Sequence, residues 1–312
     1  MSFQRSLRIG ALAVSLSAAS LSMLAAPATS MPAPGVAVST CITPTSHDAA
    51  DAARGGSGGD TRDVTAQQAR AIEARTARIL ERKGISAGEA ARTSAVVPVY
   101  IHKMLSASGA GNVTDAQISA QIAELNQDYA GGENSAAADT GFTFTLAGVD
   151  TYYNNQWHTD KQSSAYRTKT RLGGKNALNI WLVDFNYLGI ATFPWDYAKN
   201  PGIDGIRVQY SSLPGGSATN YNDGKTATHE AGHWFGLYHT FQGGCTATND
   251  EVSDTPAQSS STAGCPEGRD SCSLPGLDPI HNYMDYSYDP CYNQFTPGQS
   301  TRMDSMWAAY RA

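Results

Sequence analysis

The sequence is poor in the features that mark nucleic-acid-binding and membrane proteins. Charged residues make up 16% of its 312 residues, the formal net charge is -6, and Lys and Arg form no stripe. Because nucleic-acid binding needs clustered positive charge, nucleic acid is not an expected partner. Beyond residue 26 no apolar run is long enough to span a bilayer, so stable membrane insertion is not expected either.

Cysteine is scarce as well, and the paired C-x-x-C units of many structural zinc sites are missing. A cysteine-based zinc site is therefore disfavoured. In a secreted chain an even set of four cysteines is expected to form disulfides, each stabilising the fold by about 2–4 kcal/mol. Three pairings are open from the sequence for Cys245, Cys265, Cys272 and Cys291.

Residues 1–28 predict a secretory signal peptide. Arg5 and Arg8 precede an uncharged run over 9–26, rich in Ala, Leu and Ser, and small residues and prolines follow. The run is too short and too rich in Ser for a comfortable transmembrane helix, and Ala28 is a suitable cleavage position. We therefore expect a secreted, extracellular protein.

Residues 29–92 have almost no aromatic side chains and cannot bury enough apolar surface for a core of their own. One helix is expected between Asp63 and Gly84, with Asp63 or Thr65 as its N-cap. We interpret this segment as a pro-peptide, and Arg92 marks its junction with a catalytic domain over 93–312. A domain of roughly 220 residues can bury a proper core.

The most informative stretch is HEAGHWFGLYH over 229–239. Residues four apart share one face of a helix, so His229 and His233 can bind one zinc ion. Gly236 can end the helix in a left-handed conformation, which turns the chain back and brings His239 in as a third ligand. Three histidines leave a fourth position for water, the arrangement of catalytic zinc, and Glu230 would activate that zinc-bound water as general base.

Two other interpretations of this stretch are weaker. A buried histidine pair on an amphipathic helix would not explain the added glycine and third histidine. A purely structural zinc site would need a fourth protein ligand, and none is adjacent.

A second stretch, NYMDY over 282–286, contains Met284. Taken alone, this methionine would be interpreted as core packing. A methionine turn beneath a three-histidine zinc site, however, is known to accompany the first motif.

Together these motifs resemble the metzincin metallopeptidases, and within them the pappalysin family, M43. The resemblance covers about Val96 to the C-terminus. It implies an α+β fold, with a mixed twisted sheet and two long helices in an upper subdomain above a loop-rich, disulfide-linked lower subdomain that ends in a helix. The segments that narrow it are 229–241, Gly243-Gly244-Cys245, Asp254-Thr255-Pro256, Cys265-Pro266, 282–286, Cys291, 295–299 and Arg302-Met303.

The resemblance also implies roles for single residues. Tyr286 would stabilise the tetrahedral intermediate by a hydrogen bond to its oxyanion. Of the possible disulfides it favours Cys245–Cys272 and Cys265–Cys291. The remaining roles are zinc ligation by His229, His233 and His239, general base catalysis by Glu230, and the methionine turn at Met284.

Acidic residues suggest two further sites. Asp250, Glu251 and Asp254 crowd one loop, which is either a solvated acidic turn or a calcium site. The resemblance favours calcium, with Asp250, Asp254 and the carbonyls of Val252 and Thr255 as ligands. In pappalysins an acidic residue just before a cysteine selects Arg or Lys on the primed side; here Pro290 intervenes, and Asp289 is the nearest match.

Cys41 is the odd cysteine, and its thiolate could occupy the open zinc position as a cysteine switch. It lacks the flanking Arg and Gly expected of such a switch, so an incidental or intermolecular thiol is the alternative. His102 and His158 are expected to be structural or surface residues, because the three-histidine site is complete without them.

Periodicity and caps predict the elements of the catalytic domain. A helix from Thr114 to about Tyr129 is expected, Asn222 or Asp223 should cap the zinc helix, and a last helix should follow the cap Thr296. Edge-strand character is expected near Gly189, where a substrate could pair. The strands are expected at 96–102, 142–149, 177–183, 189–195 and 206–210, and the last helix at 297–310.

The sequence as a whole predicts a secreted zinc endopeptidase acting on proteins and peptides, with zinc and calcium as cofactors. One alternative is another metzincin family with the same mechanism. The other, from a different class, is a non-catalytic binding protein on a metzincin scaffold. Such a protein would most readily lose Glu230 or Tyr286, and both are present.

Overall fold

The computed structural model describes residues 64–85 and 94–312, which all belong to one compact unit. The predictions for the signal peptide, Cys41 and Arg92 lie outside the described residues. No helix in the described part of the chain is long and apolar enough to cross a bilayer.

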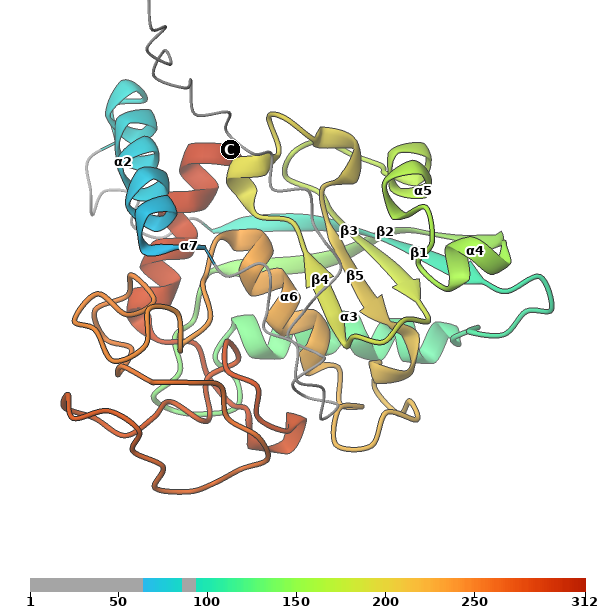
Figure 1. The fold of residues 1–312 in the computed structure, drawn as a ribbon. Coiled ribbons are helices and arrows are strands. Elements are labelled where there is room, and N and C mark those ends of the chain that lie inside the picture. The colour runs from blue at the N-terminus through green and yellow to red at the C-terminus, as the bar shows by residue number, and fades with distance from the viewer. Residues whose placement is uncertain (1–63, 86–93) are drawn as a thin grey trace, which may run out of the picture. The chain divides into compact units, whose positions relative to one another are not determined.

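A five-stranded sheet forms the upper half of the molecule, in the order β2-β1-β3-β5-β4 (Figure 1). The four longer strands pair in parallel, and only β4 is antiparallel, so the expected mixed sheet is confirmed. β3 is central and all six of its residues are buried, as its apolar sequence predicts. The strands are β1 (Ala95–Leu105), β2 (Phe142–Tyr153), β3 (Leu178–Val183), β4 (Gly189–Ala191) and β5 (Ile206–Gln209).

Two long helices, α3 (Asp115–Tyr129) and α6 (Lys225–Phe235), pack against the sheet and against each other. Their apolar faces share one core with β1, β2, β3 and β5. Thr114 caps α3 as expected, and its capping box with Gln117 satisfies the first backbone donors. The short helices α4 (Asn155–His158) and α5 (Ser163–Thr170) contribute Trp157 and Tyr166 to a separate cluster around Trp181.

The start of α6 differs from the prediction. Its N-cap is Gly224 in a left-handed conformation, with no side-chain cap, rather than Asn222 or Asp223. Tertiary contacts explain the difference, because Asn222 Nδ2 donates to Gly216 O at 2.8 Å and the Asp223 amide donates to Asp289 Oδ2 at 2.9 Å. Both residues are thereby held in the preceding loop.

The lower half, residues 236–296, contains loops and a single 3₁₀ turn, η4 (Asp289–Cys291). Two disulfides cross-link it, Cys245–Cys272 and Cys265–Cys291, which is the pairing that the resemblance favours. The last helix, α7 (Pro297–Tyr310), follows the cap Thr296 and returns to the upper half (Figure 1).

The expected helix of the N-terminal segment is α2 (Ala66–Arg82), capped by Thr65. It lies beside α7, and Leu80 packs on Ala308 and Ala309 (Figure 1). Glu73 pairs with Arg302 at 2.7 Å, so an ion pair accompanies the apolar contact.

His102 and His158 are both structural, and the surface alternative is wrong. His102 is fully buried between Asp150 Oδ1 and Asn179 Oδ1, each 2.8 Å from a ring nitrogen. His158 Nδ1 donates to Met104 O at 2.8 Å. Neither ring approaches the three histidines of the 229–239 motif in any described contact.

Candidate metal centre and active site

Three buried imidazoles meet at the end of α6. His229 and His233 lie one helical turn apart, and Gly236, at φ 101°, ends the helix so that the chain returns with His239. The Nε2 atom of His233 lies 3.1 Å from that of His229 and 3.0 Å from that of His239. The structure therefore brings together the three residues that the spacing predicted.

The hydrogen bonds of the rings show that a cation fits between them. His229 Nδ1 is 2.6 Å from the carbonyl of Tyr283, and His233 Nδ1 is 2.8 Å from that of Leu237. A carbonyl only accepts, so each Nδ1 carries the proton and each Nε2 presents a lone pair. Three nitrogens bound to tetrahedral zinc would lie about 3.3 Å apart, close to the observed separations.

Met284 lies directly beneath this centre and is fully buried. A β-carbon on Gly232 would lie 2.4 Å from Met284 Sδ, so only glycine allows the sulfur to approach α6 between the two helical histidines. The Met284 carbonyl also accepts from the amide of Thr240, next to His239. Met284 thus contacts both α6 and the loop segment that carries His239.

Glu230 is 2% exposed and lines a pocket together with His229. β4 passes so close that a β-carbon on Gly189 would lie 2.5 Å from Glu230 Oε1. Tyr286 enters the same pocket from the lower half, and its hydroxyl is 3.0 Å from His239 Nε2. The Glu230 carboxylate, the Tyr286 phenol and His229 of the three-histidine centre therefore line one pocket beside β4.

Asp289 lines the far wall of this pocket and is 2% exposed. Its Oδ2 accepts from the Asp223 amide, in the loop that leads into α6. Burial raises the pKa of Asp289 to about 7, against the lowering effect of that hydrogen bond. The group can therefore change charge near neutral pH.

Comparisons with known proteins identify the family. The model of the Peptidase_M43 family, described as pregnancy-associated plasma protein-A, matches residues 178–308. An extracellular metalloprotease of Neurospora crassa is 46% identical over 248 residues, which cover 76% of this chain and 84% of the relative. The chain belongs to the M43 family of metalloproteases. Another relative of this M43 chain, an extracellular metalloprotease of Verticillium alfalfae, is 43% identical over 291 residues, 89% of this chain and 98% of the relative.

Two solved structures share the M43 fold. Mature mirolysin of Tannerella forsythia, in complex with a cleaved peptide, is 31% identical with a TM-score of 0.59, covering 68% of this chain and 90% of that chain. A promirolysin variant from the same organism is 28% identical with a TM-score of 0.62, covering 77% and 91%. The metzincin fold expected from the sequence is thereby confirmed.

The acidic loop of this M43 chain holds buried side-chain oxygens. Asn249 Oδ1 has no hydrogen-bond partner among the described residues. Asp250 Oδ1 accepts from the Val252 amide at 3.1 Å, and the side chain of Thr255 also contacts Asp250. Burial raises the pKa of Asp250 to about 8, which a bound cation would oppose. Asp254 lies apart, because its two oxygens accept from Thr296 Oγ1 and the Gly298 amide at the start of α7.

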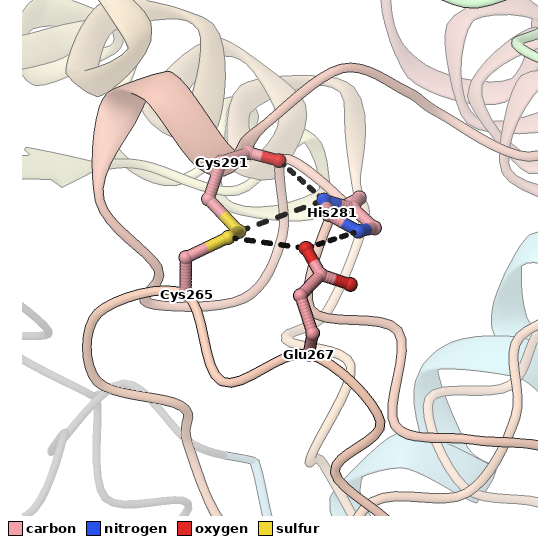
Figure 2. A group of neighbouring side chains, drawn as sticks. All are labelled: Cys265, Glu267, His281 and Cys291. Atoms are coloured by element: carbon pink, nitrogen blue, oxygen red, sulfur yellow. Dashed lines mark hydrogen bonds and ion pairs between the residues drawn. A yellow bond between two sulfur atoms is a disulfide. The ribbon is translucent and has the colours of Figure 1, made fainter.

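A cysteine-based zinc site is not supported in this M43 chain. Figure 2 shows the candidate group, Cys265, Glu267, His281 and Cys291, whose ligand atoms lie within 4.8 Å of one another. The two sulfurs are bonded to each other, so neither is a thiolate. His281 Nδ1 instead donates to the carbonyl of Cys291 at 2.6 Å, beside the pocket residue Asp289.

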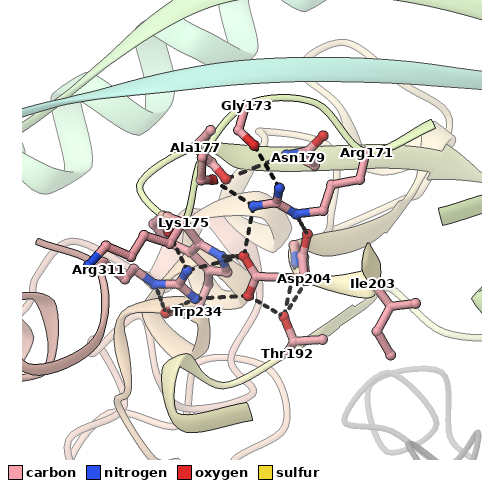
Figure 3. A network of polar contacts seen from close by, with 12 residues as sticks. Arg171, Gly173, Lys175, Ala177, Asn179, Thr192, Ile203, Asp204, Trp234 and Arg311 are labelled. Carbon is pink, nitrogen blue, oxygen red and sulfur yellow. Dashed lines mark hydrogen bonds and ion pairs between the residues drawn. The ribbon is translucent and has the colours of Figure 1, made fainter. Parts of the chain in front are cut away.

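A buried ion network next to α6 was not predicted from the sequence. Figure 3 shows Asp204 paired with Arg311, with two N–O distances of 3.1 Å, while Thr192 Oγ1 and Trp234 Nε1 donate to the same carboxylate. Arg311 also donates to the carbonyl of Trp234, in the last turn of α6. The network links the end of α6 to Thr192, the residue after β4. No local sequence pattern indicates it.

Proposed function

We propose that this M43 metalloprotease is a secreted zinc endopeptidase that hydrolyses peptide bonds in proteins. The observation that carries the proposal is the convergence of the Nε2 atoms of three histidines near the buried carboxylate of Glu230. When bound, zinc polarises a peptide carbonyl and acidifies a water molecule. The curated relatives are named extracellular metalloproteases, which supports secretion and peptidase activity together.

Glu230 is the proposed general base. It adjoins His229 and lines the same pocket, so its carboxylate can take a proton from the attacking water and pass it to the leaving amine. Tyr286 is proposed to donate a hydrogen bond to the oxyanion that develops on the carbonyl, because its hydroxyl lies beside His239 Nε2. β4 is an edge strand next to Glu230 and is proposed to pair with the substrate backbone.

Asp289 is proposed to favour Arg or Lys at the first primed position. Its carboxyl group lines the wall of the pocket that contains Glu230. Lys225 lines that pocket too, but its Nζ is held 2.5–2.7 Å from Glu124, Asp128 and Glu133. The lysine charge is therefore compensated by other carboxylates, and Asp289 in its ionised form can attract a basic side chain.

Synthesis as a precursor is the proposed form of control. Promirolysin covers a larger share of this chain than mature mirolysin does, 77% against 68%. We assign residues 1–28 to a signal peptide, 29–92 to a pro-peptide and 93–312 to the catalytic domain. We also propose that the Cys41 thiolate occupies the open zinc position in the precursor.

Calcium is proposed as a second, structural ion in the acidic loop. Asp250 is the strongest candidate ligand because its carboxylate is buried, whereas Asp254 is engaged at the start of α7. The carbonyls of Val252 and Thr255 complete the set that the resemblance implies. Hard oxygen ligands of this kind suit Ca²⁺.

The test compares the processed, secreted protein with its Glu230→Gln variant on a peptide library, sequencing every cut. Glu230→Gln keeps the size of the side chain and removes the base, so cleavage should fall by at least about 100-fold. Zinc content, measured on both proteins, should be unchanged. Glu267→Gln, at an exposed carboxylate, is the matched control and should cleave normally.

Two results would contradict the proposal. Equal cleavage by wild type and Glu230→Gln would remove Glu230 from the mechanism. Zinc bound at one equivalent without any cleavage by the wild type would favour the binding-protein alternative.

A further inference from the structure

Helix α2 belongs to the segment assigned to the pro-peptide, yet it packs against the catalytic domain (Figure 1). Its buried residues, Ala69, Thr76 and Leu80, recur at helical spacing, so one face of the helix lies against the domain. The opposite face, which includes Ala77 and Glu81, is exposed. Most helical stability in proteins comes from packing of this kind, so α2 depends on the domain surface for its structure.

The surface beneath α2 is apolar at both ends of the helix. At the C-terminal end Leu80 packs on two alanines of α7. At the N-terminal end Val64 joins a group of aromatic side chains. The ring centroid of Trp195 in this group lies 4.5 Å from that of Phe193 and 5.8 Å from that of Tyr238. Departure of α2 would uncover part of the group, and exposed apolar patches mark interaction sites.

Polar contacts hold α2 in one position on this surface. Glu73 pairs with Arg302 at 2.7 Å, and the side chain of Arg302 is only 7% exposed. Thr76 Oγ1 lies 2.9 Å from the hydroxyl oxygen of Tyr310, and Lys83 Nζ donates to a carbonyl of α7 at 2.6 Å. Loss of Glu73 would leave a nearly buried positive charge without this carboxylate, which is unfavourable. The domain surface is therefore more stable with α2 in place.

Helix α2 lies behind the metal centre rather than in the pocket. Among the described residues, none from α2 lines the pocket that contains Glu230. The aromatic group beneath α2 reaches the centre through Phe193, whose ring centroid is 5.5 Å from that of His233. Gln242 Nε2, in the loop that follows His239, donates to the carbonyl of Val64 just before α2. The helix thus supports two segments that carry histidines and adds nothing to the pocket wall.

We propose that α2 stays bound to the catalytic domain after the chain is cut between Ile85 and Ser94, so that the mature enzyme is a non-covalent complex of domain and helix. The inference rests on the precursor form described under the proposed function. The face formed by α7 and the aromatic group around Trp195 is then an interaction surface. The partner it fits is an amphipathic helix with a carboxylate midway along its apolar face, which is α2 of the same chain.

The test uses the full chain with Glu230→Gln, so that peptidase activity does not affect the result. A recognition sequence for a site-specific protease is inserted between Ile85 and Ser94, the chain is cut, and the products pass through gel filtration at micromolar concentration. Mass spectrometry of the domain peak then measures the fragment that contains α2. This fragment should remain with the domain in equal molar amount.

A substitution on the buried face should release the helix. Leu80→Asp places a carboxylate against Ala308 and Ala309, so less than about a fifth of the fragment should remain after the cut. Release should also lower the melting temperature of the domain by more than about 5 °C. Ala77→Asp, at an exposed position of the same helix, is the matched control and should retain the fragment.

A change of charge tests the ion pair and does not disturb the apolar contacts. Glu73→Lys places a like charge beside Arg302, so the fragment should dissociate more readily than in the unsubstituted chain. Glu81→Lys makes the same change on the exposed face and should have no effect. This pair of variants decides the question if Leu80→Asp prevents folding of the uncut chain.

Two results would overturn the inference. Separation of the fragment from the unsubstituted domain would show that α2 leaves with the rest of the pro-peptide. Retention in Leu80→Asp and Glu73→Lys that is as complete as in their controls would show that this face does not hold the helix. Neither result bears on the peptidase proposal, which depends on cleavage of peptides by the wild type and by Glu230→Gln.

Discussion

The halves of the molecule above and below the active site are stabilised by different means. In the upper half, strands and helices bury apolar side chains, and all residues of β3 and α6 are buried. The lower half has no sheet, and buried polar side chains lie in its interior beside apolar ones such as Tyr283 and Phe295. Gln258, fully buried, donates to Asp285 Oδ2 and accepts from Thr240 Oγ1. The upper half depends mainly on packing, together with the buried Asp204–Arg311 pair, whereas the lower half depends more on disulfides and on hydrogen bonds between buried polar groups.

The proposed catalytic residues are held in these two different ways, because each half supplies one of them. Glu230 comes from a helix in the apolar core, whereas Tyr286 follows Asp285, whose Oδ1 accepts from the amides of Thr262 and Tyr286 itself. The lower half therefore positions Tyr286 by buried hydrogen bonds to Asp285. Removing supports from each half tests the comparison.

The largest effect is expected from Asp204→Ala in the upper half. It leaves Arg311 buried without its bidentate partner, and breaking a buried pair in this way costs about 3–5 kcal/mol. The free energy of unfolding in guanidinium chloride measures the loss. Asp270→Ala, at an exposed carboxylate, is the control and should cost less than about 0.5 kcal/mol. A loss below 1 kcal/mol for Asp204→Ala would show that the network does not support this half.

Removing either disulfide of the lower half should cost about 2–4 kcal/mol. The cysteines of the two pairs are 27 and 26 residues apart, so replacing either pair with alanine should lower stability by similar amounts. Only the Cys265–Cys291 variant should also alter cleavage preference, since Cys291 ends η4, which begins at Asp289. Equal changes of preference in both variants would contradict this distinction.

Calcium should stabilise the lower half by a smaller amount. At 100 times its dissociation constant the gain is about 2.7 kcal/mol, visible as a rise in melting temperature when Ca²⁺ is added to zinc-loaded protein. Asp250→Asn should abolish the rise, and Glu251→Gln, one residue on, should retain it. A rise that survives Asp250→Asn would place the ion elsewhere.

The smallest effect concerns pH. Because burial raises the pKa of Asp289 to about 7, the group is largely protonated at pH 6 and ionised at pH 8. The ionised fraction rises about tenfold between these values, so the preference for Arg over Ala at the first primed position should grow by up to about tenfold. Asp289→Asn should flatten this profile of kcat/KM ratios. A preference that falls as pH rises would exclude Asp289 as its source.

Local patterns identified the parts of the fold that depend on neighbours in sequence. Thr114 and Thr296 cap their helices as expected, and Thr65, one of the two expected caps, begins α2. In each case a glutamine three residues later completes a capping box. The histidine spacing likewise predicted the convergence at the end of α6. Strand lengths were less accurate, since β2 continues to Tyr153 rather than ending at Val149.

Contacts between distant residues could not be predicted in this way. Asp204 and Arg311 are 107 residues apart, and an aspartate in a loop gives no sign that it is buried. The start of α6 was wrong because Asp223 is held by Asp289, another distant contact. The sequence also could not show that Asp254, one of the expected calcium ligands, instead accepts hydrogen bonds at the start of α7.

Gly189 sets a limit on redesign of this enzyme. Any other amino acid there would place its β-carbon 2.4 Å from Glu230 Cγ, so the strand or the base would have to move. Specificity can be altered from the pocket wall, at Asp289, without touching this contact. Saturation mutagenesis of the cleft should therefore return active variants at the walls and none at position 189.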